Sequence, residues 1–164
     1  MKSMGIDPGT YNMGIGLVSS VDDELNYLDS QVLSPNKKLP ISKRLYEINK
    51  SLVDIIDEWR PDSISIEQPF VGKNIKSALA IGYAQAVAMI CAETFSVPIH
   101  LYTPRQVKYA ITNYGNASKE QVQDMIISLL DYGDSSISLD ASDALALAIC
   151  HIYDRDYSDQ EYLD

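Results

Sequence analysis

The sequence predicts an α/β domain in which helices flank a five-stranded mixed sheet. The first third of the chain holds three strand-like segments joined by short turns, which is typical of an antiparallel meander. The remainder alternates strand-like and helix-like segments, which is typical of parallel strands joined by helical crossovers. The expected order is three strands, a helix, a strand, a helix, a strand and then further helices.

The five expected strands are short runs of apolar residues bounded by turn residues. Pro8 and Gly9 turn the chain after the first, and Asp22 and Asp23 separate the second from the third. The fourth carries Ile64 on one face and ends near a carboxylate. The predicted strands are residues 3–7, 12–20, 24–33, 62–68 and 97–102.

The helices are predicted from apolar residues that recur three or four positions apart and from capping residues. Pro40 suits the first turn of the first helix, and Pro61 ends it. Thr103 caps the third helix, and Ser118 with Gln121 forms a capping box for the fourth. The predicted helices lie between 40 and 61, at 75–95, at 103–112, from 118 onward, and at 140–153.

The chain has 164 residues, enough for one domain, which we place at 1–153. Residues 154–164 carry five acidic residues and one arginine, and we expect them to form a disordered tail. The start of the chain leads directly into a strand, so we expect no signal peptide.

Two features predict a cytoplasmic protein without a membrane span. Cys91 and Cys150 lie inside apolar helical patterns, which indicates reduced core residues. The longest apolar run, 77–92, is shorter than a typical span and includes Ser77 and Gln85. It is therefore expected to be a buried or interface helix.

The charge distribution favours a polyanionic partner in the middle of the chain. The formal net charge is −10, but residues 68–119 hold five basic residues against Glu93 alone. Local potential steers binding more than total charge does. On charge alone, a few scattered surface lysines explain the same pattern. The five basic residues are Lys73, Lys76, Arg105, Lys108 and Lys119.

Four carboxylates are candidates for one site. Asp7 and Glu67 end the first and fourth strands, and the carboxyl ends of adjacent parallel strands form the usual site of such sheets. Asp140 and Asp143 share one face at the start of the last helix. Each also has an ordinary interpretation, because Asp before Pro-Gly is a common turn residue and acids at a helix start interact favourably with the helix dipole.

If these four carboxylates converge, they need cations to offset their repulsion. Oxygen ligands favour Mg²⁺, with Mn²⁺ as a substitute, and His100 and His151 are too few for a His-rich site. Two such ions about 4 Å apart hydrolyse phosphodiesters, one activating water and one stabilising the leaving oxygen.

Four segments in series resemble the RuvC family of Holliday-junction resolvases: GIDPGT, SIEQPFVGKN, RQVK and DASDALALAI, from residue 4 to about 152. GIDPGT alone is loose, because actin-like ATPases open similarly. The resemblance implies a three-layer RNase H-like nuclease domain over 1–153. It also implies a homodimer that nicks two opposed strands of a four-way DNA junction with two Mg²⁺ ions per site.

The resemblance assigns roles to individual residues. The family's acidic tetrad, which binds metal and catalyses, falls on Asp7, Glu67, Asp140 and Asp143. Its two lysines near the scissile phosphate fall on Lys108 and Lys119, and the aromatic residue that inserts at the junction centre falls on Phe70. The helix at 75–95 matches the family's dimer helix. With Phe70 and these two lysines, the predicted DNA-binding set also includes Lys73, Lys76 and Arg105.

Two departures predict a divergent, phage-type member with a relaxed choice of branched DNA. Gln85 stands where the family usually has Arg, and the chain is more acidic than typical resolvases. Three other functions stay open: a related nuclease acting on structured RNA, an actin-like nucleotide-binding module and a non-catalytic DNA-binding protein. The chain is short for two actin-like lobes, and the four acids argue against a dead enzyme. A helicase partner is unknown.

Overall fold

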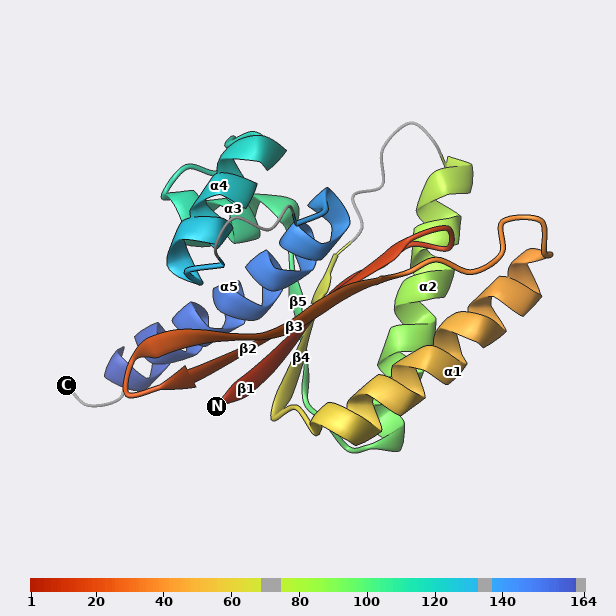
Figure 1. Cartoon of the computed structure of the whole chain (residues 1–164), viewed down its shortest axis with the longest axis horizontal. Helices are drawn as coiled ribbons and strands as arrows, with labels where there is room; N and C mark the ends of the chain where they lie inside the picture. The colour runs from red at the N-terminus through yellow and green to blue at the C-terminus, as the bar shows by residue number, and fades with distance from the viewer. Residues whose placement is uncertain (69–74, 133–136, 162–164) are drawn as a thin grey trace.

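The computed structural model describes residues 1–68, 75–132 and 137–161 (Figure 1). It holds one five-stranded sheet in the order β3-β2-β1-β4-β5. β1 pairs antiparallel with β2 and parallel with β4, so the predicted mixed sheet is confirmed. The strands are β1 (Lys2–Asp7), β2 (Met13–Val21), β3 (Glu24–Leu33), β4 (Ser63–Glu67) and β5 (Ile99–Tyr102).

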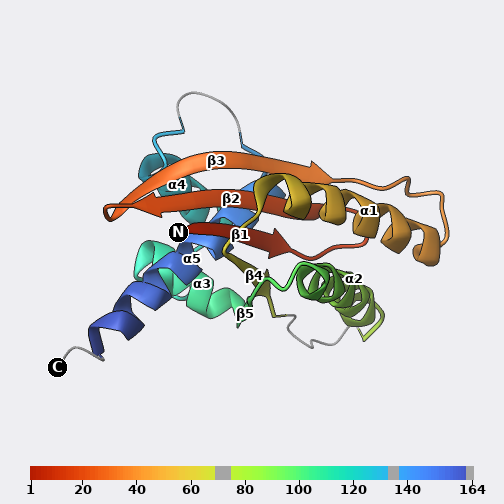
Figure 2. The same cartoon turned by 90° about the horizontal axis from the view of Figure 1, so that it is seen from below.

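Helices cover both faces of the sheet, which makes three layers (Figures 1 and 2). Two hydrophobic cores result, one on each face. The fully buried Met4 and Ile6 of β1 pack in the core that includes Ile48 and Leu52 of α1. The helices are α1 (Ile41–Trp59), α2 (Ile75–Thr94), α3 (Pro104–Thr112), α4 (Lys119–Leu129) and α5 (Leu139–Glu161).

Glycines let α5 lie directly on the sheet. A Cβ at Gly5 would overlap the carbonyl oxygen of Ala144, and one at Gly16 would come within 2.5 Å of the Leu145 amide nitrogen. Gly5 and Gly16 are opposite each other in the β1–β2 pair. The missing side chains therefore allow close approach of backbone to backbone, which places the start of α5 over the end of β1.

Local signals account for most element boundaries. Asp22 and Asp23 have φ of 51° and 64°, the backbone of a two-residue type I′ hairpin turn between β2 and β3. Ser118 accepts a hydrogen bond from the Gln121 amide, and the Gln121 side chain accepts one from the Ser118 amide. Thr103 caps α3 in the same way. Both predicted caps are confirmed.

The last helix is longer than the sequence predicted. α5 continues to Glu161, whereas we expected it to end near 153 and give way to a disordered tail from 154. Residues 154–161 contain neither Pro nor Gly, so nothing in their sequence breaks a helix. The Tyr102 hydroxyl donates to Asp154 Oδ2 at 3.0 Å, which ties the first residue of the expected tail to β5.

α2 is apolar on more than one face, as the sequence predicted. Among the described residues, α2 is the one helix whose length and apolar composition would suffice to cross a membrane. Only 22% of its most apolar stretch is buried. Four small residues face the core: Ala84, Ala88, Cys91 and Ala92. Both cysteines of the chain are free and buried, as expected for core residues.

Candidate active site

The predicted strand carboxylates lie side by side. β1 and β4 are adjacent parallel strands whose last register pair is Ile6 with Ile66, so Asp7 and Glu67 follow at the same edge of the sheet. Asp7 lies two residues beyond Gly5, and successive residues of a strand alternate faces. Asp7 therefore points to the face that α5 covers.

The glycine contact brings the helix carboxylates to the same edge. Asp7 is opposite Gly14 in the β1–β2 pair, and a Cβ at Gly14 would overlap the carbonyl oxygen of Asp140. Asp143 lies three residues further along α5, on the same face of the helix. All four predicted carboxylates are thus gathered where β1 and β4 end and α5 begins.

The ionisation of Asp7 reflects this crowding. Burial raises its pKa to about 7, with further increases from the negative charges of Glu67, Asp143 and Asp140. Burial and then Asp143 also raise the pKa of Glu67. Burial and neighbouring anions disfavour the charged forms of Asp7 and Glu67, so the site favours an added positive charge.

Two of the predicted lysines reach this cluster. Lys119, the first residue of α4, forms an ion pair with the Asp143 carboxylate. Its pKa is raised because this pairing and the charges of Asp7 and Glu67 outweigh the effect of burial. Lys108 of α3 is close enough for its charge to lower the pKa of Glu67. Both helices therefore present cations to the acids.

Asn12 belongs to the site, although the sequence argument missed it. Its Nδ2 donates to Asp140 Oδ2 at 3.3 Å, and its Oδ1 accepts from the Ser34 hydroxyl at 3.1 Å. This short chain of hydrogen bonds holds the Asp140 carboxylate. The available signal was a polar residue on the turn that directly follows Asp7.

Other predicted residues lie at the margins of the cluster. The Arg105 side chain packs beside Gly115, and Lys76 lies near Tyr11. Gln85 Nε2 donates to the backbone oxygen of Glu67 at 3.4 Å, so this departure from the family pattern contacts the strand that carries a site acid. Phe70 and Lys73 lie outside the described residues.

The four carboxylates are the candidate ligands for a metal ion. Within the described ranges, no three His, Cys, Asp or Glu side chains are placed so that they could hold one metal ion. Asp143 pairs with Lys119, and Asp140 accepts a hydrogen bond from Asn12. The donor set fits a hard divalent cation, because it consists of carboxylate oxygens, and burial together with the neighbouring negative charges raises the pKa of Asp7.

Comparison with known proteins identifies the family of this chain. The sequence matches the family described as crossover junction endodeoxyribonuclease RuvC over residues 3–151. The chain belongs to the RuvC family. The RuvC of Dehalococcoides mccartyi is 45% identical over 158 residues, which are 96% of this chain and 95% of that protein. The RuvC of Christiangramia forsetii is 43% identical over 150 residues, 92% of this chain and 78% of that protein.

Solved RuvC structures share the fold. The Thermus thermophilus RuvC structure superposes with a TM-score of 0.88 at 27% identity and covers 96% of this chain and 97% of its own. The same Thermus protein in complex with a Holliday junction substrate gives a TM-score of 0.90, also at 27% identity, with 96% of each chain covered. The RNase H-like fold and the family predicted from the motifs are both confirmed.

Proposed function

We propose that this chain is a Mg²⁺-dependent crossover junction endodeoxyribonuclease that resolves four-way DNA junctions by paired nicks. The family match over residues 3–151 supports the reaction class, and the Thermus complex supports the substrate class. The observation that carries the proposal is the gathering of Asp7, Glu67 and the α5 carboxylates, where burial and then the neighbouring negative charges raise the pKa of Asp7 to about 7. Mn²⁺ is the expected substitute metal.

The four carboxylates would hold two divalent cations, which would supply an activated water and stabilise the leaving oxygen of the phosphodiester. The chain's own groups have separable tasks. Asp7 and Glu67 are fixed by paired strands, and Asn12 orients Asp140 through a hydrogen bond. These contacts keep the ligands in place before the substrate arrives.

Lys108 and Lys119 would contact the phosphate that is cut. Both stand beside the acids, and a phosphate brought to the site would compete for the Lys119 ammonium that Asp143 engages. We extend the DNA surface to Arg105 and Lys76 on either side. Phe70 and Lys73, which precede α2 in the sequence, stay predictions as the junction-inserting aromatic and a backbone contact.

We infer that two copies pair through α2. Its solvent-facing side carries large apolar residues, Ile75, Leu79, Tyr83 and Ile90, which are 68%, 53%, 49% and 62% exposed. Their spacing of four, four and seven places them along one stripe of the helix. A contiguous exposed apolar surface of this kind marks an interface, and a homodimer supplies the second active site that paired nicks require.

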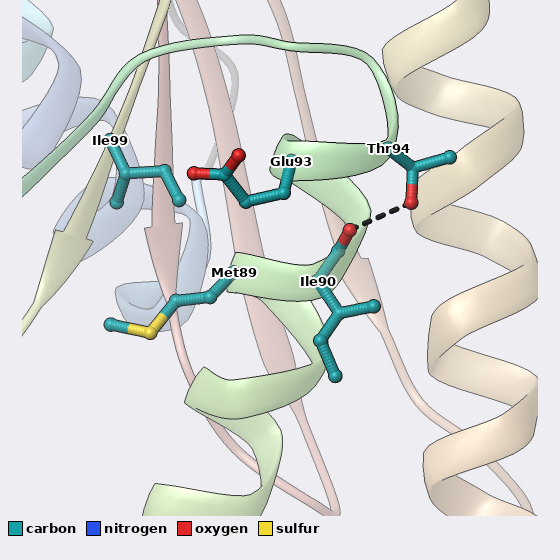
Figure 3. A pocket seen from close by; sticks show the side chains of 5 residues that line it. All are labelled: Met89, Ile90, Glu93, Thr94 and Ile99. Carbon is teal, nitrogen blue, oxygen red and sulfur yellow. Dashed lines mark hydrogen bonds between the residues drawn. The ribbon is translucent and has the colours of Figure 1, made fainter.

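The far end of the same helix adds an open hollow of about 490 Å³ (Figure 3). Its lining is mostly apolar and comes from the end of α2 and the first residue of β5. Because this hollow continues from the exposed Ile90, it extends the surface that we assign to the second copy. The lining residues are Met89, Ile90, Glu93, Thr94 and Ile99.

A cytoplasmic location is part of the same proposal. Cys91 and Cys150 are buried free thiols, which suits a reducing compartment. In this proposal the exposed apolar side of α2 contacts a second copy of the chain. The domain boundary at 153 and the divergent, phage-type character stay predictions.

A cleavage assay tests the proposal. Synthetic four-way, three-way, flap and linear DNA is incubated with the protein in Mg²⁺ or in EDTA. We expect symmetric nicks in the four-way junction with Mg²⁺ only, and their loss in Asp7→Asn. Asp54→Asn, the same change at an exposed position of α1, is the matched control and should cut normally. Intact branched DNA in every Mg²⁺ reaction would refute the assignment.

The RNA alternative is tested in the same reactions. The fold and the acids suit hydrolysis of either nucleic acid, so a structured RNA of equal length is included as a competitor and as a substrate. Preferential cutting of the RNA would favour the alternative. We expect the DNA junction to be cut at least tenfold faster.

A further inference from the structure

Arg44 is a buried cation without an anionic partner in the described structure. It belongs to α1 and is only 7% exposed. Its Nε and Nη1 are buried, and no hydrogen-bond acceptor among the described residues reaches them. The ion pairs found in the described ranges are Arg60 with Asp57 and Lys119 with Asp143, so neither uses Arg44. Burial of an unpaired guanidinium is costly, which calls for a compensating group.

Tyr11 is the side chain that lies on this guanidinium. The Arg44 Cζ is 4.0 Å from the centre of the Tyr11 ring, a cation–π contact. Tyr11 is itself 52% exposed, so one part of the ring covers Arg44 while the rest meets solvent. The contact is therefore both a support for Tyr11 and a partial shield for the buried charge.

The surroundings of Tyr11 attract anions. Arg44 lowers the pKa of Tyr11, first through hydrogen bonding and then through its charge, and the charges of Lys76 and Lys37 lower it further. Arg44 therefore contacts the exposed phenol directly, and the positive charges of Lys76 and Lys37 also act on it.

This cluster stands beside the carboxylate site. Tyr11 belongs to the turn between Asp7 and Asn12, both of which belong to the site. In both views that turn lies between the N-terminal parts of α1 and α2, across the site from α3 and α4 (Figures 1 and 2). The carboxylates therefore have cations on two sides. The cations around Tyr11 lie on one side, and Lys108 and Lys119 lie on the other.

We propose that Tyr11, Lys37 and Lys76 form a binding site for a DNA backbone phosphate, and that Arg44 positions Tyr11 for this contact. The proposal rests on the proposed function, since the anion is a phosphodiester of the bound DNA. The Tyr11 hydroxyl donates a hydrogen bond to a phosphate oxygen, and the two lysines neutralise the phosphate charge. The buried Arg44 guanidinium strengthens the positive electrostatic potential beneath the Tyr11 ring. No base contact is involved, so the site adds affinity and register without sequence preference.

The test measures binding of a labelled four-way junction in EDTA, where wild-type protein does not cut, at a series of salt concentrations. Tyr11→Phe keeps the ring on Arg44 and removes the hydroxyl, and it should weaken binding about fivefold. Lys76→Gln should reduce the slope of log affinity against log salt by about 1. Tyr46→Phe and Lys50→Gln, at exposed positions further along α1, are the matched controls and should change neither quantity.

Tyr11→Glu separates binding from a structural role. A carboxylate at this position pairs with Arg44, so the thermal unfolding midpoint should hold or rise. The same carboxylate repels the phosphate, so junction affinity should fall more than tenfold. The test therefore expects a maintained or higher unfolding midpoint together with a lower junction affinity. It keeps Arg44 in place, because loss of Arg44 could unfold α1.

Cleavage by wild-type protein in Mg²⁺ is recorded in parallel, because it reports the proposed function separately. If wild-type protein binds the junction but Tyr11→Phe and Tyr11→Glu bind with unchanged affinity and salt slope, the phosphate site is wrong and the Arg44–Tyr11 contact is only structural. If the variants weaken binding as expected, the site stands whether or not cleavage is efficient.

Discussion

At the scale of single residues, Asp7 shows how the site couples charge to stability. Its pKa is raised to about 7 from an ordinary value of 3.8, chiefly by burial and then by Glu67. A carboxyl whose pKa is raised in the folded state stabilises the fold at low pH. That contribution is lost as pH rises through the folded-state pKa. The metal-free protein should therefore lose stability between about pH 4 and pH 7.

We expect Asp7→Asn to be more stable than wild type by about 2–4 kcal/mol at pH 8 in EDTA, because the amide carries no charge to bury. The difference should shrink toward zero near pH 4. Urea unfolding at several pH values measures it, with Asp54→Asn as the control. Equal stabilities at pH 8 would show that the carboxylates do not strain the metal-free fold.

The same shift predicts the pH dependence of metal binding. Metal ligation requires ionised Asp7, so apparent Mg²⁺ affinity should fall roughly tenfold for each pH unit below about 7. Titration of cleavage rate with Mg²⁺ at pH 6, 7 and 8 measures this dependence. A half-saturating Mg²⁺ concentration that is constant across this range would contradict it.

Asn12→Ala should release the Asp140 carboxylate. Loss of such a supporting hydrogen bond typically costs 10–100-fold in metal affinity or activity, and we expect about tenfold here. Unfolding should be unchanged, since this hydrogen bond is exposed. The Mg²⁺ dependence of cleavage is the measurement. Asn26→Ala on the distant β2–β3 hairpin is the control, and equal effects of the two changes would remove Asn12 from the site.

The sequence predicted the site acids but not their support, and the reason is separation along the chain. Asp7 and Glu67 each end an apolar strand, which local pattern reveals. Asn12 contacts a residue 128 positions away, and its neutral side chain carries no chemical signature of its own. Tyr11 and Arg44 were missed for the same reason, because a cation–π contact between a turn and a helix leaves no periodic trace in sequence.

At the scale of elements, the contact of α5 with β1 and β2 determines where the helix carboxylates lie. Helix and strand boundaries were predictable because caps and turns are local signals. The glycine contact was not, since Gly5, Gly14 and Gly16 read as ordinary strand glycines until α5 is placed over them. The continuation of α5 to Glu161 was missed because acidic composition was given more weight than the absence of helix breakers.

Gly5→Ala should displace α5, because the added methyl would overlap the Ala144 carbonyl oxygen. We expect a loss of about 3 kcal/mol or more in unfolding free energy and reduced cleavage by the folded fraction. Gly82→Ala is the matched control, as open space surrounds a Cβ there and helix propensity favours Ala by about 1 kcal/mol. Denaturant titration compares them, and similar stabilities would disprove the close contact.

At the scale of the whole molecule, the exposed stripe of α2 predicts that function needs two copies. Leu79→Glu should convert the dimer to a monomer, because a charge would be buried at the centre of the interface. Sedimentation measures the state. On a supercoiled cruciform plasmid, paired nicks give linear DNA, whereas the monomer should give nicked circles. Val21→Glu, at an exposed apolar residue at the end of β2, is the control and should leave both results unchanged.

The glycine face of the sheet has a consequence for how this protein tolerates change. Because backbone rests on backbone there, the relative position of Asp7 and Asp140 does not depend on the shape of any large core side chain. Apolar residues in either core can then be exchanged for others over evolutionary time while the spacing of the carboxylates is preserved. Substitutions in the two cores can therefore accumulate largely independently of selection for the catalytic carboxylates.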